Sequence, residues 1–180
     1  MILVYTGNGK GKTSAALGNV FRALGHGWRV LVIQFMKGDW PIVFGELESA
    51  RRHARLEVLQ LGRGFVKIMG DKKPLSEHRS AAQNAMRTAG KKILSGKYDL
   101  VVLDEALYAL ETGIPRLLKA EELLKIIKSK PKKTHLILTG RIQSSVLKKK
   151  IFSRADLVTE MKEIKHPYQQ GLPALKGIDY

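Results

Sequence analysis

The stretch Gly7-Asn8-Gly9-Lys10-Gly11-Lys12-Thr13 follows the apolar run Ile2-Leu3-Val4-Tyr5 and leads into Ser14-Ala15-Ala16-Leu17. A buried strand, a glycine-rich turn and a helix start therefore come in this order, which is typical of a phosphate-binding loop, or P-loop. Inward-facing backbone N–H groups and the helix N-terminus attract an anion. The sequence thus predicts a nucleoside triphosphate site, whose contacts are Gly7, Asn8, Gly9, Lys10, Gly11, Lys12, Thr13 and Ser14.

The loop departs from the general pattern G-x-x-x-x-G-K-[ST] at one position. The first glycine of that pattern would fall on Thr6, and Gly7 comes one residue later. The cradle for the phosphates is therefore shifted, and Lys10 adds a second cation beside Lys12. A glycine-rich turn without a ligand is the alternative, but lysine and threonine stand where phosphate and Mg²⁺ need them.

Apolar runs alternate with helical patterns along the whole chain, which predicts an α/β fold. We expect a doubly wound, three-layer domain with a mainly parallel sheet, of the RecA-like P-loop NTPase type, formed by residues 1–180 as a single domain. The expected strands are 2–6, 30–35, 56–61, 100–104, 135–139 and 157–161. The expected helices are 13–24, 45–54, 76–94, 105–110, 119–129 and 144–153.

Composition narrows the class of protein. The 180 residues include no cysteine, so disulfides and thiolate metal sites are excluded. We find no signal peptide and no apolar stretch near the ~20 residues of a membrane span, and therefore expect a soluble, cytoplasmic protein. A net charge of +16 could indicate nucleic acid. We favour a solvated lysine surface, because no nucleic-acid-binding motif accompanies the charge.

Asp104 and Glu105 directly follow the apolar run Leu100–Leu103 and are the second group of candidate site residues. A carboxylate delivered beside a P-loop completes the ligands of a Mg²⁺ ion, so we expect Thr13, Asp104 and Glu105 to hold the metal, with Glu105 as the direct ligand. An acidic helix cap is the alternative. No Asn-Lys-x-Asp string is present, so ATP is expected rather than GTP, and Arg141 could approach the triphosphate.

Two long connections, 36–44 and 62–75, follow expected strands and are typical of binding loops. Trp40 and Phe65 lie within them and could contact a flat apolar ligand. The alternative is that both rings fold back onto the core.

Together these motifs closely resemble the ATP:corrinoid adenosyltransferases of cobalamin biosynthesis. The resemblance runs in order over nearly the whole chain, and the shifted glycine of the P-loop is itself characteristic of that family. Beyond the P-loop it is carried by Ala23-Leu24-Gly25-His26-Gly27, Gln34-Phe35-Met36-Lys37-Gly38-Asp39-Trp40, Val101-Val102-Leu103-Asp104-Glu105, Leu138-Thr139-Gly140-Arg141, Val158-Thr159-Glu160-Met161, Lys165-His166-Pro167 and Lys176-Gly177-Ile178-Asp179-Tyr180.

The resemblance implies that a reduced corrinoid, as Co(I), attacks the ribose C5′ of ATP and releases triphosphate. Lys12 and Lys10 would neutralise the leaving group as catalytic residues, and Arg22 matches a family position near the nucleoside. No general base is needed, because Co(I) carries its own electron pair. The family also implies an external flavoprotein reductant and a homodimer.

Two features depart from the family. Bacterial members carry an N-terminal helix over the corrinoid, whereas here Met1 leads directly into a strand, so we expect no covering helix. Lys67 stands where the family has a tryptophan that, with the aromatic ring at Phe65, helps to expel the lower axial ligand of the corrinoid. Two other functions remain open: an ATP-driven, RecA-like motor acting on nucleic acid, and a nucleotide-binding protein without turnover.

Overall fold

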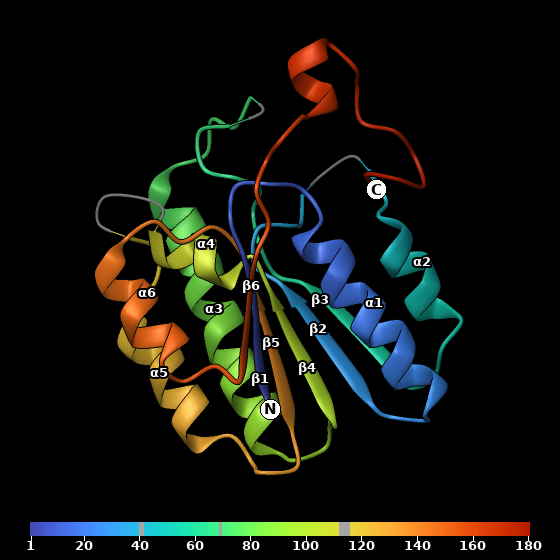
Figure 1. Cartoon of the computed structure of the whole chain (residues 1–180), viewed down its shortest axis with the longest axis vertical. Coiled ribbons are helices and arrows are strands. Elements are labelled where there is room, and N and C mark those ends of the chain that lie inside the picture. The colour runs from blue at the N-terminus through green and yellow to red at the C-terminus, as the bar shows by residue number, and fades with distance from the viewer. Residues whose placement is uncertain (40–41, 69, 112–115) are drawn as a thin grey trace.

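A computed structural model describes residues 1–39, 42–68, 70–111 and 116–180. Its centre is a six-stranded sheet in the order β3-β2-β4-β5-β1-β6 (Figure 1). All five neighbouring pairs of strands are parallel. The strands are β1 (Ile2–Thr6), β2 (Val30–Gln34), β3 (Leu56–Gln60), β4 (Leu100–Asp104), β5 (His135–Thr139) and β6 (Leu157–Glu160).

Helices cover both faces of the sheet (Figure 1), which confirms the predicted doubly wound α/β fold. On one face lie α1 (Lys12–Gly25) and α2 (Gly45–Arg51). On the other lie α3 (Leu75–Leu94), α4 (Ala106–Glu111), α5 (Ala120–Ser129) and α6 (Ser145–Phe152). The prediction extended α2 to residue 54 and did not include the short 3-10 helix η1 (Pro167–Gln170).

The core is divided by the sheet into two apolar clusters. The larger cluster joins the sheet to α3, α4, α5 and α6, and the smaller one joins it to α1. All five residues of β4 are buried, as its continuous Val/Leu run predicts. The edge strand β6, in contrast, is exposed at all four positions. Within the described residues, no helix combines the length and apolarity that a bilayer span requires.

The carboxyl ends of the strands bring polar side chains to one edge of the sheet. Gln34 on β2 pairs in register with Gln60 on β3 and with Asp104 on β4. Gln34 is fully buried, accepts a hydrogen bond from the Gln60 amide at 2.8 Å, and donates to Glu46 at 2.7 Å. Because ligands of such folds bind at this edge, the sheet places its polar strand ends where a site is expected.

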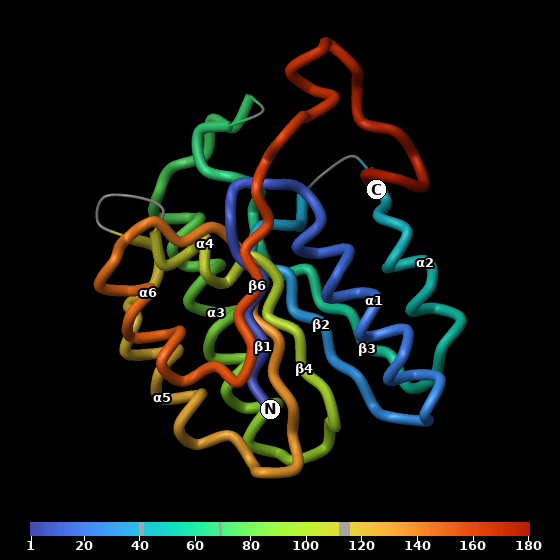
Figure 2. The backbone as a smooth tube through the Cα atoms, viewed as in Figure 1, coloured from blue at the N-terminus to red at the C-terminus, as the bar shows by residue number. Residues whose placement is uncertain are grey.

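The last twenty residues fold over the same edge. From β6 the chain rises past the β1–α1 loop, forms η1, and returns toward the start of α2 (Figure 2). We call residues 161–180 the C-terminal tail. The C-terminal tail therefore lies beside the P-loop, where it contacts Gly9 and Lys10.

Candidate active site

The P-loop connects β1 to α1 through two left-handed glycines. Gly7 has φ of 101° and Gly11 has φ of 109°, a region in which residues with a Cβ atom are strained. Thr6, at the first glycine position of the general pattern, still belongs to β1 and is buried. The structure therefore explains why the first glycine of the loop is shifted by one position: the chain turns at Gly7 and not at residue 6.

The C-terminal tail packs so closely on the P-loop that it leaves no room for a side chain at Gly7 or Gly9. A Cβ atom on Gly7 would lie 2.3 Å from the carbonyl oxygen of Met161, and one on Gly9 would lie 2.8 Å from that of Lys162. The Gly9 N–H donates to the Met161 carbonyl at 2.8 Å. The loop is thus fixed by the backbone that follows β6.

Lys12 is folded into the loop. Its Nζ donates to the carbonyls of Gly7 at 3.0 Å and Gly9 at 2.8 Å, and the residue is 7% exposed. Burial lowers the pKa of Lys12, while the nearby carboxylate of Glu105 opposes this shift. A desolvated ammonium that donates to two carbonyls is well suited to receive an anion, because a phosphate would supply a full negative charge.

Asp104 links the P-loop to the strand ends. Its Oδ1 accepts hydrogen bonds from the hydroxyls of Thr13 at 2.8 Å and Thr139 at 2.7 Å, and the residue is fully buried. The Thr139 hydroxyl in turn accepts from the backbone N–H of Glu105 at 2.9 Å. The structure therefore joins the three expected metal ligands, Thr13, Asp104 and Glu105, in one network.

Glu105 is held in an unusual backbone conformation at the end of β4. Its φ of 59° lies in the left-handed region, which is rare for residues other than glycine and is concentrated at functional sites. Burial, followed by the charge of Asp104, raises the pKa of Glu105 to about 7. Burial thus disfavours the charged form of Glu105, and a bound cation would restore it, so this carboxyl group is well placed to bind a cation.

This pKa predicts how the stability of the protein depends on pH when neither nucleotide nor metal is present. The folded state keeps the Glu105 proton up to about pH 7, whereas the unfolded chain releases it near the usual value of 4.5. The free energy of unfolding should therefore fall as pH rises from about 4.5 to about 7, by up to about 3 kcal/mol. Urea unfolding at several pH values measures this change in the free energy of unfolding. Glu105→Gln should remove this fall, and an equal fall in that variant would contradict the assignment.

A cavity of about 730 Å³ opens over the P-loop. Residues Lys10–Ser14 form its floor together with Glu105. Leu17, Ile42, Phe44 and Phe65 supply apolar walls, and Ala174, Gly177, Ile178, Asp179 and Tyr180 of the C-terminal tail close one side. A polyanion-binding floor under apolar walls suits a ligand with a charged tail and a flat body.

Sequence reasoning missed several residues of this cavity. Lys37 lies on its wall, donates to Glu46 at 2.8 Å, and stands 4.1 Å from the ring centre of Phe44. Its position just after β2, beside the site, was an available signal. The ion pair between Lys10 and Asp179 was also missed, because nothing in the local sequence links residues at opposite ends of the chain.

Phe65, Arg141 and Asn8, three other predicted site residues, lie in different surroundings. Phe65 lines the cavity and also packs edge-on against Tyr108, with ring centres 5.3 Å apart, so both of its predicted environments occur. Arg141 is exposed. Its charge adds to the lowering of the Lys12 pKa by burial and opposes the rise of the Glu105 pKa, so Arg141 acts electrostatically on the site. Asn8 is exposed on the loop, and Trp40 lies outside the described residues.

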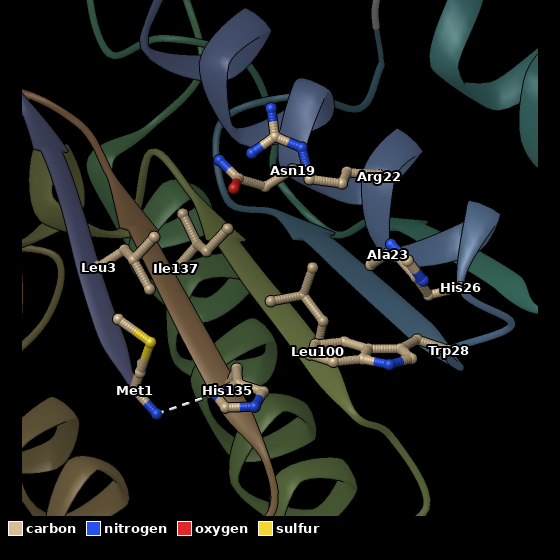
Figure 3. A pocket seen from close by; sticks show the side chains of 10 residues that line it. All are labelled: Met1, Leu3, Asn19, Arg22, Ala23, His26, Trp28, Leu100, His135 and Ile137. Carbon is tan, nitrogen blue, oxygen red and sulfur yellow. Dashed lines mark hydrogen bonds between the residues drawn. The ribbon is translucent and has the colours of Figure 1, made fainter.

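Arg22 is not brought to the cavity over the P-loop. It lies in the last turn of α1 and lines a separate pocket of about 220 Å³ (Figure 3). Trp28 stacks there on His135, with ring centres 5.1 Å apart. Since α1 rises about 1.5 Å per residue, the ten-residue step from Lys12 to Arg22 separates their Cα atoms by about 15 Å along the helix. Within this chain, the predicted nucleoside contact of Arg22 stays a prediction.

Comparisons with known proteins identify the family of this chain. The family described as "ATP:corrinoid adenosyltransferase BtuR/CobO/CobP" matches residues 1–180. The corrinoid adenosyltransferase of Escherichia coli is 34% identical over 180 residues, covering 100% of this chain and 85% of that protein. Corrinoid adenosyltransferase CobA of Salmonella typhimurium is 37% identical over 181 residues, with coverage of 100% and 85%. The corrinoid adenosyltransferase of Pseudomonas aeruginosa is 36% identical over 182 residues, with coverage of 100% and 83%. The chain belongs to the ATP:corrinoid adenosyltransferase family.

Proposed function

We propose that this chain transfers the 5′-deoxyadenosyl group of ATP to the Co(I) centre of a reduced corrinoid and releases inorganic triphosphate. The cobalt electron pair forms the Co–C5′ bond, and the C5′–O bond breaks with its electrons leaving on the triphosphate. Cobalt becomes Co(III), and no proton moves. The corrinoid is a substrate, so its metal comes with it.

One observation carries this proposal: the P-loop forms the floor of an open cavity with apolar walls. The polyanionic end of ATP suits the floor, and a flat macrocycle suits the walls. Such an arrangement favours the approach of a bulky partner to the nucleotide. Alignment of the two reacting atoms can lower the barrier by about 7 kcal/mol in good cases.

Lys12 and Lys10 are the proposed catalytic residues. The reaction develops charge on the triphosphate, and both ammonium groups stand at the cavity floor. Lys12 is already buried and directed into the loop, so it gains most from an arriving phosphate. The residues Gly7 to Ser14 would hold the triphosphate, with Phe65, Arg141, Arg22 and Trp40 as further substrate contacts carried over from the sequence.

We propose Mg²⁺ as the cofactor. The hydroxyl of Thr13 and the carboxylates of Asp104 and Glu105 are hard oxygen donors joined in one network, which is the ligand chemistry this ion prefers. When bound, Mg²⁺ neutralises the leaving triphosphate. The raised pKa of Glu105 supports its role as a direct ligand, since Asp104 is already shared by two hydroxyls.

An anaerobic assay with ATP, Mg²⁺ and chemically reduced cob(I)alamin tests the proposal. We expect the absorption spectrum of a Co–C bond together with stoichiometric triphosphate. ADP and phosphate, stimulated by DNA or RNA, would instead indicate the motor. Corrinoid binding without product would indicate a carrier. Family membership argues against both alternatives.

The Lys10–Asp179 ion pair predicts a modest effect of the C-terminal tail on ATP binding. Asp179 holds the cation that the triphosphate is proposed to use. Asp179→Asn should therefore lower the KM for ATP by about twofold, and by about fivefold at most, because partly exposed pairs contribute 0.2–1 kcal/mol. The effect should shrink at high salt. Steady-state kinetics at two ionic strengths measures it, and a rise in KM would mean that the tail closes on bound ATP.

We further propose a single-domain, cytoplasmic enzyme that acts as a homodimer and receives electrons from a separate flavoprotein. The exposed apolar side chains of Phe21, Leu157 and Val158, at 79%, 40% and 40% exposure, support contact with a second copy. The flavoprotein follows from the family resemblance, and a chain without cysteine is consistent with it.

A further inference from the structure

Where the loop after β3 meets α3, the side chains of an aspartate and a histidine form a buried pair that the proposed reaction does not use. The name β3–α3 loop refers here to residues 61–68 and 70–74, which the structure describes. His78, in the first turn of α3, is 2% exposed, and its Nε2 lies 3.0 Å from Oδ2 of Asp71 in the loop. Burying two ionisable groups is costly unless they are paired, so this contact needs an explanation.

The carboxylate of Asp71 also accepts hydrogen bonds from two backbone N–H groups of the loop. Its Oδ2 accepts from the N–H of Lys67 at 3.0 Å, and its Oδ1 accepts from the N–H of Lys73 at 3.3 Å. These hydrogen bonds hold the pKa of Asp71 below its ordinary value, the bond from Lys67 being the largest cause. One carboxylate thus ties together three points of the segment from Lys67 to His78.

The anchored point at Lys67 is strained. Its φ of 54° lies in the left-handed region, which a lysine adopts only when its surroundings impose it. Here the hydrogen bond to Asp71 supplies that constraint. Without the carboxylate, the turn at Lys67 would relax toward a more ordinary conformation.

Phe65 lies two residues before this turn and faces the cavity. It lines the same space as Glu105 and Lys12, and its ring packs against Tyr108 of α4. The start of the loop is separately fixed, because the Gly62 N–H donates to the Lys37 carbonyl at 2.9 Å. Phe65 is thus held between one anchor at Gly62 and a second at Asp71.

We propose that Asp71 and His78 are positioning residues that set the place of Phe65 in the cavity wall and thereby act on the corrinoid, not on ATP. The proposal rests on the proposed function. The contacts of the pair described above join residues 67 to 78 and include no P-loop residue, so their loss should spare the nucleotide floor.

Asp71→Ala tests this inference by separating the two substrates. We expect the KM for cob(I)alamin to rise about tenfold, while the KM for ATP stays within about twofold. His78→Gln should raise it less, about threefold, because a glutamine amide can still donate to Asp71. Glu57→Ala is the matched control: it removes the carboxylate on β3 that accepts from Lys92 of α3 at 2.6 Å, and it should change neither KM.

Hydrogen exchange of the backbone amides gives a readout independent of turnover. In Asp71→Ala the amides of Lys67 and Lys73 should exchange faster, and that of Gly9 should not. If the parent makes no adenosylated corrinoid while these amides respond, the proposed function fails and the anchoring role stands. An active parent with an unchanged corrinoid KM in both Asp71→Ala and His78→Gln, or with both KM values raised together, would overturn the inference. Should Asp71→Ala fail to fold, His78→Gln decides.

Discussion

Lys12→Ala is expected to reduce kcat for adenosyl transfer by at least about 10³-fold, which is the upper range for removing one preorganised charge from a transition state. Lys12 is the most deeply placed cation of the cavity floor, where its Nζ contacts two loop carbonyls. Without it, the triphosphate would leave from a site lacking its principal counter-charge. Anaerobic initial rates at saturating ATP and cob(I)alamin measure the loss.

The fold should survive this substitution. Burial already disfavours the Lys12 charge, as its lowered pKa indicates, so alanine removes a desolvated ammonium and two hydrogen bonds together. Circular dichroism and Tm check this point. Lys10→Ala is the matched comparison: Lys10 is exposed and paired with Asp179, so its loss should cost about tenfold. Parental activity in Lys12→Ala would show that the loop does not act as assigned.

Asp104→Asn is expected to lower kcat/KM by about 10²-fold and to raise the Mg²⁺ concentration needed for half-maximal rate. The carboxylate accepts from the hydroxyls of Thr13 and Thr139, and an asparagine amide offers one oxygen and no negative charge. Thr13 would then lose part of its orientation toward the metal. Rates measured over a series of Mg²⁺ concentrations reveal the change.

Thr139→Ser provides the control for this network. Serine keeps the hydroxyl that donates to Asp104 and accepts from the Glu105 N–H, so the Mg²⁺ dependence should remain close to that of the parent. If Asp104→Asn gave the same Mg²⁺ titration as the parent, the carboxylate would have no part in holding the ion.

The fold was predictable because most of its strands are continuous apolar runs that end in a polar residue or a glycine turn. Leu100–Leu103 followed by Asp104 is the clearest case, and the structure buries all of it. The order of the strands was not predictable in the same way. β1, β4 and β5 are similarly apolar, and their order in the sheet depends on long-range packing, such as that of α1 against all three.

The site was predictable where its residues follow one another in sequence and not where they meet across the fold. The P-loop and the Asp104-Glu105 pair are local signals, and the structure joins them through Thr13. The contribution of Asp179 depends on a tail that returns over the sheet. The partners of Asp71 lie within seven residues of it, but no sequence motif marks which backbone N–H groups a loop carboxylate will accept from. Arg22 shows that a residue can match a family position in sequence and still line a different pocket from the one over the P-loop.

The contact between Gly9 and Met161 has a consequence for how the protein is made. The P-loop is synthesised well before β6, but the backbone that holds Gly7 and Gly9 follows that strand. A ribosome-bound chain that stops short of β6 therefore has the residues of the loop without its support. Nascent chains of increasing length should gain affinity for immobilised ATP abruptly, once Met161 has left the exit tunnel, and not gradually as successive strands emerge.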